Sequence, residues 1–194
     1  MRAYSNSRIS KETEIDFYIN LDGTGKNNIK TGIGFLDHML VLLSFHSGID
    51  MEILCKGDLE VDDHHSVEDI GIVFGEALLN AIGDKKGIGR YGMCYLPMDE
   101  ALAQVVLDFS GRGYLVFNSA FNREKVGELS TEMIEEFFRA LAIKAGITLH
   151  INMIYGKNDH HKIEAIFKGF ARALKEAITV DENNMIIKSS KGIL

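Results

Sequence analysis

The sequence predicts an α+β protein made of two similar halves, in which two sheets enclose a layer of helices. Two observations predict it. The motif His-His-x-x-Glu begins at His64 and again at His160, 96 positions later. Strand and helix patterns also follow one another in the same order before each copy. We therefore expect a fused pseudo-dimer, with a first half over residues 1–90 and a second half over residues 91–194, folded as one compact unit.

The first half contains two strand patterns and two helix patterns. Residues 15–21 alternate apolar and mostly polar side chains, as a half-buried strand does, and the turn sequence Asp-Gly-Thr-Gly at 22–25 ends this strand. Residues 35–45 predict a helix, and residues 49–55 alternate as a second strand. A second helix is expected over 67–82, because its apolar residues fall on one face.

The second half passes through the same kinds of element. Strands are expected over 102–109, 114–117 and 147–153, and a helix over 131–145. The apolar residues of 163–174 are spaced for one face of a final helix. The order of strand, helix, strand and helix therefore repeats along the chain.

Single residues also recur in register between the halves. His38 lies ten residues before a Gly-Ile pair that opens a strand, and Glu136 lies ten residues before the matching pair. Extending the register to the start of each half pairs Glu12 with Glu100. Differences in length fall between these landmarks, where loops tolerate them.

Composition excludes several classes of function. Hydrophobic residues make up 46% and charged residues 25% of the chain, which is ordinary for a globular protein with a core. The net charge of −7 argues against binding to nucleic acid or to an anionic membrane, although a small anionic substrate needs only a local basic pocket. Cys55 and Cys94 alone make no disulfide framework. Residues 1–14 are polar, and no apolar run has the length of a membrane span, so we expect a cytoplasmic protein.

The repeated His-His-x-x-Glu motif indicates metal binding. Imidazole nitrogens and carboxylate oxygens are ligands for Mn, Fe, Zn or Ni. At a helix start, Glu68 shares a face with His64 four residues earlier, or with His65 three residues earlier. Adjacent histidines point in different directions, so a pair can serve two metals, or one metal and a supporting contact. One copy could be accidental, but recurrence in register favours metal binding. The second copy consists of His160, His161 and Glu164.

Residues at matched positions could complete the metal shells. His38 and Glu136 are expected on equivalent helices, and each could supply a further ligand. Asp63 and Asp159 precede the two motifs and could act simply as helix N-caps.

Basic residues are candidates for holding an anionic group. Lys168 lies one helical turn beyond Glu164, so it could hold an anionic group of a metal-bound substrate. Arginine can grip phosphate with two parallel hydrogen bonds. Further candidates are Arg90, Arg112 and Lys191, whereas an ordinary solvated face is expected for Arg172 and Lys175.

Five segments resemble the imidazoleglycerol-phosphate dehydratase family of histidine biosynthesis, and the match covers essentially the whole chain. They are residues 31–39 (Thr-Gly-Ile-Gly-Phe-Leu-Asp-His-Met), 62–71 (Asp-Asp-His-His-Ser-Val-Glu-Asp-Ile-Gly), 97–101 (Pro-Met-Asp-Glu-Ala), 158–168 (Asn-Asp-His-His-Lys-Ile-Glu-Ala-Ile-Phe-Lys) and 189–192 (Ser-Ser-Lys-Gly). The resemblance implies halves of three strands, a helix, a strand and a helix, similar to the second domain of ribosomal protein S5, and hence two four-stranded sheets. It also implies a homo-oligomeric shell of twenty-four subunits, with two Mn²⁺ per active site and sites at subunit interfaces.

The resemblance also implies a role for individual residues. The implied metal ligands are His38, His64, His65, Glu68, Glu136, His160, His161 and Glu164. The implied phosphate ligands are Arg90, Arg112, Lys168, Ser190 and Lys191. Glu12 would be the catalytic carboxylate, with Asp99 nearby. One departure matters, because many family members have His where this chain has Glu136, which changes the charge of that shell.

The implied reaction is the dehydration of imidazole glycerol phosphate to imidazole acetol phosphate. The proton lost is not next to a carbonyl, so the imidazole ring must accept the electrons. We expect a di-manganese site to stabilise an imidazolate that expels the hydroxyl, after which Glu12 takes the neighbouring C–H proton. Two alternatives are a two-metal phosphohydrolase, which would release phosphate from sugar phosphates, and a non-catalytic protein shell assembled by metal, in which Glu12→Gln would change nothing.

Overall fold

The computed structural model describes residues 2–194, which fold into two halves with the same order of elements. The first half contains β1 (Ala3–Ile9), β2 (Thr13–Asn20), β3 (Asn27–Lys30), α1 (Gly34–Ser47), β4 (Asp50–Gly57) and α2 (His64–Ile82). The second half contains β5 (Tyr91–Met98), β6 (Ala101–Asp108), β7 (Tyr114–Asn118), β8 (Lys125–Val126), β9 (Leu129–Ser130), α3 (Met133–Ala145), β10 (Thr148–Tyr155) and α4 (Asp159–Ile178). Within residues 2–90, no element corresponds to the small β8–β9 hairpin.

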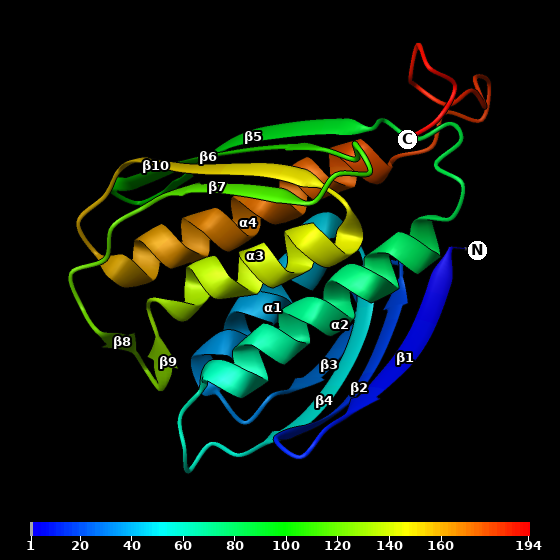
Figure 1. Ribbon diagram of the computed structural model, residues 1–194. Coiled ribbons are helices and arrows are strands. Elements are labelled where there is room, and N and C mark those ends of the chain that lie inside the picture. The colour runs from blue at the N-terminus through cyan, green and yellow to red at the C-terminus, as the bar shows by residue number, and fades with distance from the viewer. Residues whose placement is uncertain (1) are drawn as a thin grey trace.

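Each half forms one four-stranded mixed sheet with the same topology. The strand orders are β1-β2-β4-β3 and β5-β6-β10-β7. In each sheet the first three strands are antiparallel, and the last strand runs parallel to its neighbour. The two sheets form the outer layers of the molecule, with all four helices between them (Figure 1). The predicted α+β fold with two sheets around a helical layer is confirmed.

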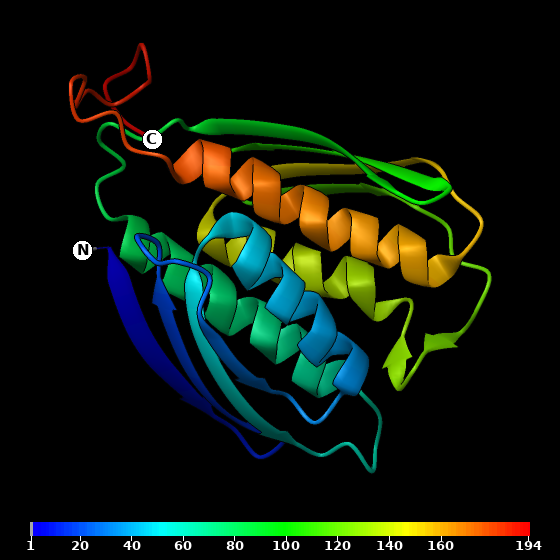
Figure 2. The same cartoon turned by 180° about the vertical axis from the view of Figure 1, so that it is seen from behind.

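Helices from opposite halves pack on one another in the middle of the molecule. The main pairings are α2 with α3 and α1 with α4, which Figure 2 shows from behind. Aromatic rings tie these layers together: the ring of Phe74 lies 5.4 Å from Phe17 and 6.4 Å from Phe137. The Phe137 ring in turn stacks on Phe167 at 5.4 Å. The core is therefore shared by both halves, and neither half buries its helices alone.

Both helices that precede the inner strands end in the same way. Gly48 follows α1 and Gly146 follows α3, and both have left-handed backbones with φ of 78° and 64°. The N–H of each glycine donates to a carbonyl of the preceding turn, at Ser44 or Ala142. Glycine adopts this conformation without the strain of a Cβ atom, which explains the Gly-Ile landmark in both halves.

Periodicity alone placed some boundaries wrongly and overlooked some strands. Helix α2 begins at His64 and not at residue 67, because its first turn is polar and carries no apolar repeat. Strand β1 is mostly exposed, so no alternation marks it. Strand β5 contains Gly92, where a Cβ would lie 1.9 Å from the carbonyl oxygen of Ala173 on α4. Among residues 2–194, no helix combines the length and apolar character needed to cross a membrane.

Candidate active site

The two His-His-x-x-Glu motifs occupy the first turns of α2 and α4. The backbone N–H of His64 donates to Oδ1 of Asp62 at 2.8 Å, and that of His160 donates to Oδ1 of Asn158 at 2.9 Å. These short polar side chains satisfy N–H groups that a helix start leaves unpaired, so α2 begins at His64 and α4 begins at Asp159, one residue before His160. The first two turns of each helix then place the Glu on the same side as the first His.

The aspartates that directly precede each His-His pair do not cap the helices with their side chains. Asp63 accepts hydrogen bonds from the backbone N–H and the hydroxyl of Ser130 in β9, and both contacts cross between the halves. Asp159 accepts from the N–H groups of Asn122 and Arg123. The N-cap interpretation of these two side chains is therefore wrong: they hold the β8–β9 segment against the helix starts.

One set of candidate metal ligands meets in a compact group. His38 of α1 joins His160 and Glu164 of α4, and one ligand atom from each lies within 4.8 Å of the others. The Oε2 atom of Glu164 is 3.1 Å from Nε2 of His160 and 3.8 Å from Nε2 of His38. Two imidazoles and a carboxylate are a donor set that suits a divalent transition metal. This group is the only one of its kind within residues 2–194.

Lys168 lies against this group, as its position one turn beyond Glu164 predicts. Its Nζ atom donates to Oε1 of Glu164, whose side chain is 8% exposed. Burial acts to raise the pKa of Glu164, but the hydrogen bond and charge of Lys168 outweigh it, so this pKa is lowered. The carboxylate therefore stays ionised, as a ligand must. Arg172 and Lys175, further along α4, are exposed as expected.

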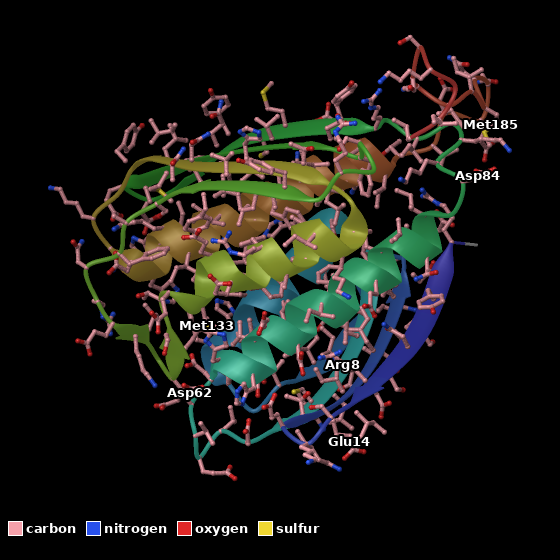
Figure 3. All side chains as sticks on the ribbon, viewed as in Figure 1. Arg8, Glu14, Asp62, Asp84, Met133 and Met185 are labelled. Carbon is pink, nitrogen blue, oxygen red and sulfur yellow. The ribbon has the colours of Figure 1, made fainter. Side chains whose placement is uncertain are left out.

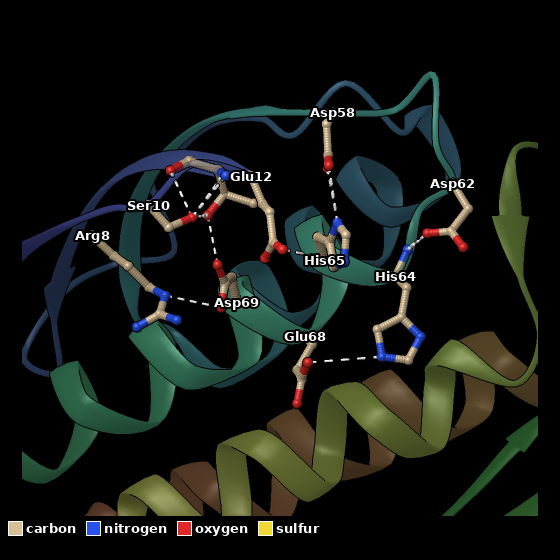
Figure 4. A network of polar contacts seen from close by, with 10 residues as sticks. Arg8, Ser10, Glu12, Asp58, Asp62, His64, His65, Glu68 and Asp69 are labelled. Atoms are coloured by element: carbon tan, nitrogen blue, oxygen red, sulfur yellow. Dashed lines mark hydrogen bonds and ion pairs between the residues drawn. The ribbon is translucent and has the colours of Figure 1, made fainter.

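The matching set in the other pair of helices is less compact. His64 Nε2 lies 3.7 Å from Oε2 of Glu68, and both residues lie on the side of α2 that faces α3 (Figure 4). Glu136 of α3 lines the same surface hollow as His64, which has a volume of about 330 Å³. Its carboxylate, however, lies 3.4 Å from the guanidinium of Arg139. Glu136 is thus near this set but is not gathered into a three-ligand group.

The second histidine of the first pair points elsewhere. Nδ1 of His65 hydrogen bonds with Oδ2 of Asp58 at 3.0 Å, and its Nε2 lies 3.8 Å from Oε1 of Glu12. Figure 4 shows His65 between these two carboxylates, away from His64 and Glu68. The hydrogen bond that His65 donates to the Asp58 carboxylate raises the pKa of His65. The structure therefore brings the predicted catalytic Glu12 beside a predicted metal ligand within one chain.

The second histidine of the other pair has the same kind of surroundings. Nδ1 of His161 lies 2.7 Å from Oε2 of Glu100, and its Nε2 lies 3.6 Å from Oδ2 of Asp99. Glu100 also accepts from the backbone N–H groups of Asn158 and Lys157. The pKa of Glu100 is lowered to about 2. The largest cause is the hydrogen bond from the backbone N–H of Asn158, and the next is the hydrogen bond from His161. The hydrogen bond that His161 donates to the Glu100 carboxylate raises the pKa of His161.

Adjacent imidazoles in both pairs diverge strongly. The rings of His64 and His65 are 6.3 Å apart and inclined at 73°, and those of His160 and His161 are 6.0 Å apart and inclined at 85°. The two imidazoles of each pair therefore present their nitrogen atoms to two separate places. This agrees with the expectation that adjacent histidines point in different directions.

Most of the predicted phosphate ligands meet at the end of the chain. The guanidinium of Arg90 is held by Asp108, at 2.8 Å for Nε and 3.2 Å for Nη2. Its Nη1 donates to the carbonyl of Lys188 at 2.5 Å, which fixes the segment that carries Ser190 and Lys191. The same segment ends at Leu194, which lies against Gly111, the neighbour of Arg112.

Lys168 lies apart from the other phosphate candidates. The N–H of Arg90 bonds to the carbonyl of Ala177, nine residues beyond Lys168 on α4, which corresponds to ~13 Å along a helix. In Figure 3, Asp62, which precedes the first motif, and Met185, in the C-terminal segment, lie at opposite ends of the molecule. One chain therefore does not gather the metal and phosphate candidates into a single pocket.

Three partners of these residues were not predicted from the sequence: Asp58, Asp108 and Glu100. Glu100 could have been found, because the register of the halves pairs it with Glu12. Asp58 lies in the loop between β4 and α2, and Asp108 ends a strand, and no motif or periodicity marks either.

Comparison with known proteins identifies close relatives. Residues 31–174 match the family model described as imidazoleglycerol-phosphate dehydratase. Proteins of that name from Clostridium botulinum and Clostridioides difficile are 64% and 57% identical, over 96% and 100% of this chain and 95% and 100% of their own. The crystal structure of the Staphylococcus aureus protein is similar with a TM-score of 0.84 and 51% identity, covering 92% of this chain and 99% of that one. The enzyme from Pyrococcus furiosus, solved in complex with (S)-C348, is similar with a TM-score of 0.83 at 36% identity, covering 97% and 100%.

Proposed function

The chain belongs to the imidazoleglycerol-phosphate dehydratase family, and on that premise we propose that it is a hydro-lyase of histidine biosynthesis that converts imidazole glycerol phosphate to imidazole acetol phosphate and water. The observation that carries the proposal is the group of His38, His160 and Glu164, with Lys168 beside it. It combines ligands for a metal with a cation for the anionic group of the substrate.

The donor sets suit two Mn²⁺ ions. We propose that His38, His160 and Glu164 hold one ion, and that His64, Glu68 and Glu136 hold the other. Nitrogen and oxygen donors are the types that manganese accepts, and three donors leave coordination positions open for substrate. His65 and His161 diverge from their neighbours, so each is free to complete a set belonging to another copy of the chain.

The bound ions would act as Lewis acids that let the imidazole ring of the substrate carry negative charge. Glu12 would take the proton from the carbon next to the one that loses its hydroxyl. The C–O bond beside the ring breaks, and the hydroxyl leaves as water after protonation. The resulting enol gains a proton at the carbon beside the ring, loses the proton of its hydroxyl group and becomes the ketone. Asp99, 3.6 Å from His161, is the second carboxylate available for proton transfer.

The phosphate group would be held by Lys168, Arg90, Arg112, Ser190 and Lys191. Arg90 has five N–H donors, and three of them are used by Asp108 and Lys188, so two remain for phosphate oxygens. Because Lys168 and Arg90 are separated within one chain, we propose that different copies contribute them to one site. A homo-oligomer with interfacial sites, which we propose to be a shell of twenty-four subunits, meets this requirement.

The decisive experiment is an assay for imidazole acetol phosphate with metal-stripped and Mn²⁺-reloaded protein. We expect chelation to abolish turnover and to loosen the oligomer in sedimentation velocity, since ligands would come from neighbouring copies. Reloading with Mn²⁺ should restore both. Full turnover by the stripped protein would contradict the metal proposal, and release of inorganic phosphate in place of the ketone would favour a phosphohydrolase.

A further inference from the structure

Asp69 is a buried carboxylate that joins α2 to the β1–β2 hairpin. It directly follows Glu68 on the helix, and its side chain is 9% exposed. Its Oδ2 accepts a hydrogen bond of 2.5 Å from the hydroxyl of Thr13 in β2, and its Oδ1 lies 2.9 Å from Nε of Arg8 in β1. Figure 4 shows these contacts on the flank of α2 next to the hairpin tip that carries Glu12.

A chain of hydroxyl groups extends from Asp69 to the hairpin tip. The single hydroxyl proton of Thr13 goes to the carboxylate, so in the 3.3 Å contact with Ser10 the hydroxyl of Thr13 accepts. The hydroxyl oxygen of Ser10 in turn accepts from the backbone N–H groups of Glu12 and Thr13, at 3.1 and 3.0 Å. The carbonyl of Glu12 accepts from the N–H of Asp58 at 3.1 Å. The backbone of Glu12 is therefore held on both sides.

The carboxylate of Glu12 itself is left free. Its side chain is 54% exposed, and in the described part of the chain its one ion-pair contact is with His65 at 3.8 Å. A general base needs a fixed position and an unoccupied oxygen, and this arrangement supplies both.

The second half lacks this network. By the register of the halves, Ala101 takes the place of Thr13, and Ala165 takes the place of Asp69. The equivalent carboxylate, Glu100, is instead bonded directly through its side chain. The fold therefore does not require the contact between Asp69 and Thr13, because the other sheet forms without it.

We infer that Asp69, acting through the Thr13 hydroxyl, is a positioning residue that sets Glu12 relative to the metal-binding face of α2. Helix α2 carries His64, His65 and Asp69, so the residue that positions the base lies on the same rigid element as the ligands. This inference rests on the proposed function, in which Glu12 is the base.

The test is Thr13→Val, which keeps the shape of the side chain and removes the hydroxyl. We expect kcat to fall about tenfold, because small displacements of a catalytic group are costly. KM, bound metal and oligomer size should stay unchanged. Thr13→Ser restores the hydroxyl and should restore kcat. Ser7→Ala is the matched control, since Ser7 donates to Asp16 at 2.6 Å across the same two strands but on the outer face of the sheet.

A second measurement separates positioning from general destabilisation. In a Glu12→Gln background the Thr13→Val change should have no further effect on kcat, because the group it positions is gone. If Thr13→Val lowers kcat by the same factor in the Glu12→Gln background, the inference is overturned. It is also overturned if the kcat of Thr13→Val equals that of Ser7→Ala. If Glu12→Gln alone keeps its turnover, Glu12 is not the base and the proposed function loses its base assignment. That result comes from the single variant, so it can be told apart from a failure of the positioning inference.

Discussion

The Nδ1 atom of His161 lies 2.7 Å from the carboxylate of Glu100, which also accepts two backbone hydrogen bonds. The equivalent carboxylate in the first half, Glu12, is 3.8 Å from His65 and makes none of these bonds. Each half therefore has a carboxylate beside the second histidine of its motif. The side chain of Glu100 is held by hydrogen bonds, whereas that of Glu12 is not. They should respond differently to the same substitution.

Glu12→Gln should lower kcat by about 10²- to 10⁴-fold while leaving bound metal and assembly intact, because it removes only the base. Glu100→Gln should mainly weaken metal binding, by about 10- to 100-fold, because Glu100 orients the imidazole of His161. Steady-state kinetics and elemental analysis of both variants after dialysis distinguish the two effects. Normal turnover in Glu12→Gln would move the base to another residue, with Asp99 the next candidate.

Glu136→Ala should reduce bound Mn²⁺ toward about half, and Glu136→His should restore much of it, since imidazole also binds the metal. Glu135→Ala is the control, because Glu135 contacts the same Arg139 but is not one of the proposed ligands. Elemental analysis after dialysis measures the result. Full metal content in Glu136→Ala would show that Glu136 is only a surface carboxylate paired with Arg139.

Lys168→Ala should raise KM by about tenfold and change kcat less, if Lys168 binds phosphate equally in the ground state and the transition state. Arg172→Ala is the control, since Arg172 lies one turn further along α4 and is exposed. Initial rates over a range of substrate concentrations provide both constants. An unchanged KM in Lys168→Ala would leave this lysine with only its ion pair to Glu164.

Cys55 should resist thiol reagents in the folded protein. Burial raises its pKa to about 11 from a usual value of 9.0, so the reactive thiolate is scarce at pH 8. The labelling rate in a Cys94→Ala variant should keep rising about tenfold per pH unit between pH 8 and pH 10, beyond the point where a free thiol levels off. The free energy of unfolding should fall as the pH rises from about 9 toward about 11, because the unfolded chain loses this proton first. Rapid labelling at pH 8 would contradict the burial argument.

The sequence was enough to predict the elements that bury one regular face. The strand over 15–21, the helix over 35–45 and the shared order of both halves follow from apolar spacing, because these segments face the common core. The predicted starts of α2 and α4 lie three and four residues after the observed starts, because the first turns of these helices make polar contacts and carry no apolar repeat. The hairpin of β8 and β9 was missed, because strands of two residues have no periodicity.

The repeat in the sequence led to two candidate groups of residues. The structure gathers His38 with His160 and Glu164, whereas Glu136 lies near His64 but pairs with Arg139. The contacts of Asp58, Asp69 and Asp108 were not predictable. They depend on where a loop, a helix flank and a strand end meet in space, and a single aspartate leaves no pattern in the sequence.

The pairing of α1 with α4 and of α2 with α3 has a consequence for how such a protein could arise. Each proposed ligand set draws one helix from either half, so a chain of half this length could assemble such a set only as a symmetric dimer, and its two sets would be identical. Two copies joined in one chain need not be identical. In this chain His38 is matched by Glu136, and Thr13 is matched by Ala101. Fusion therefore allows the two proposed sites to be altered separately by natural selection.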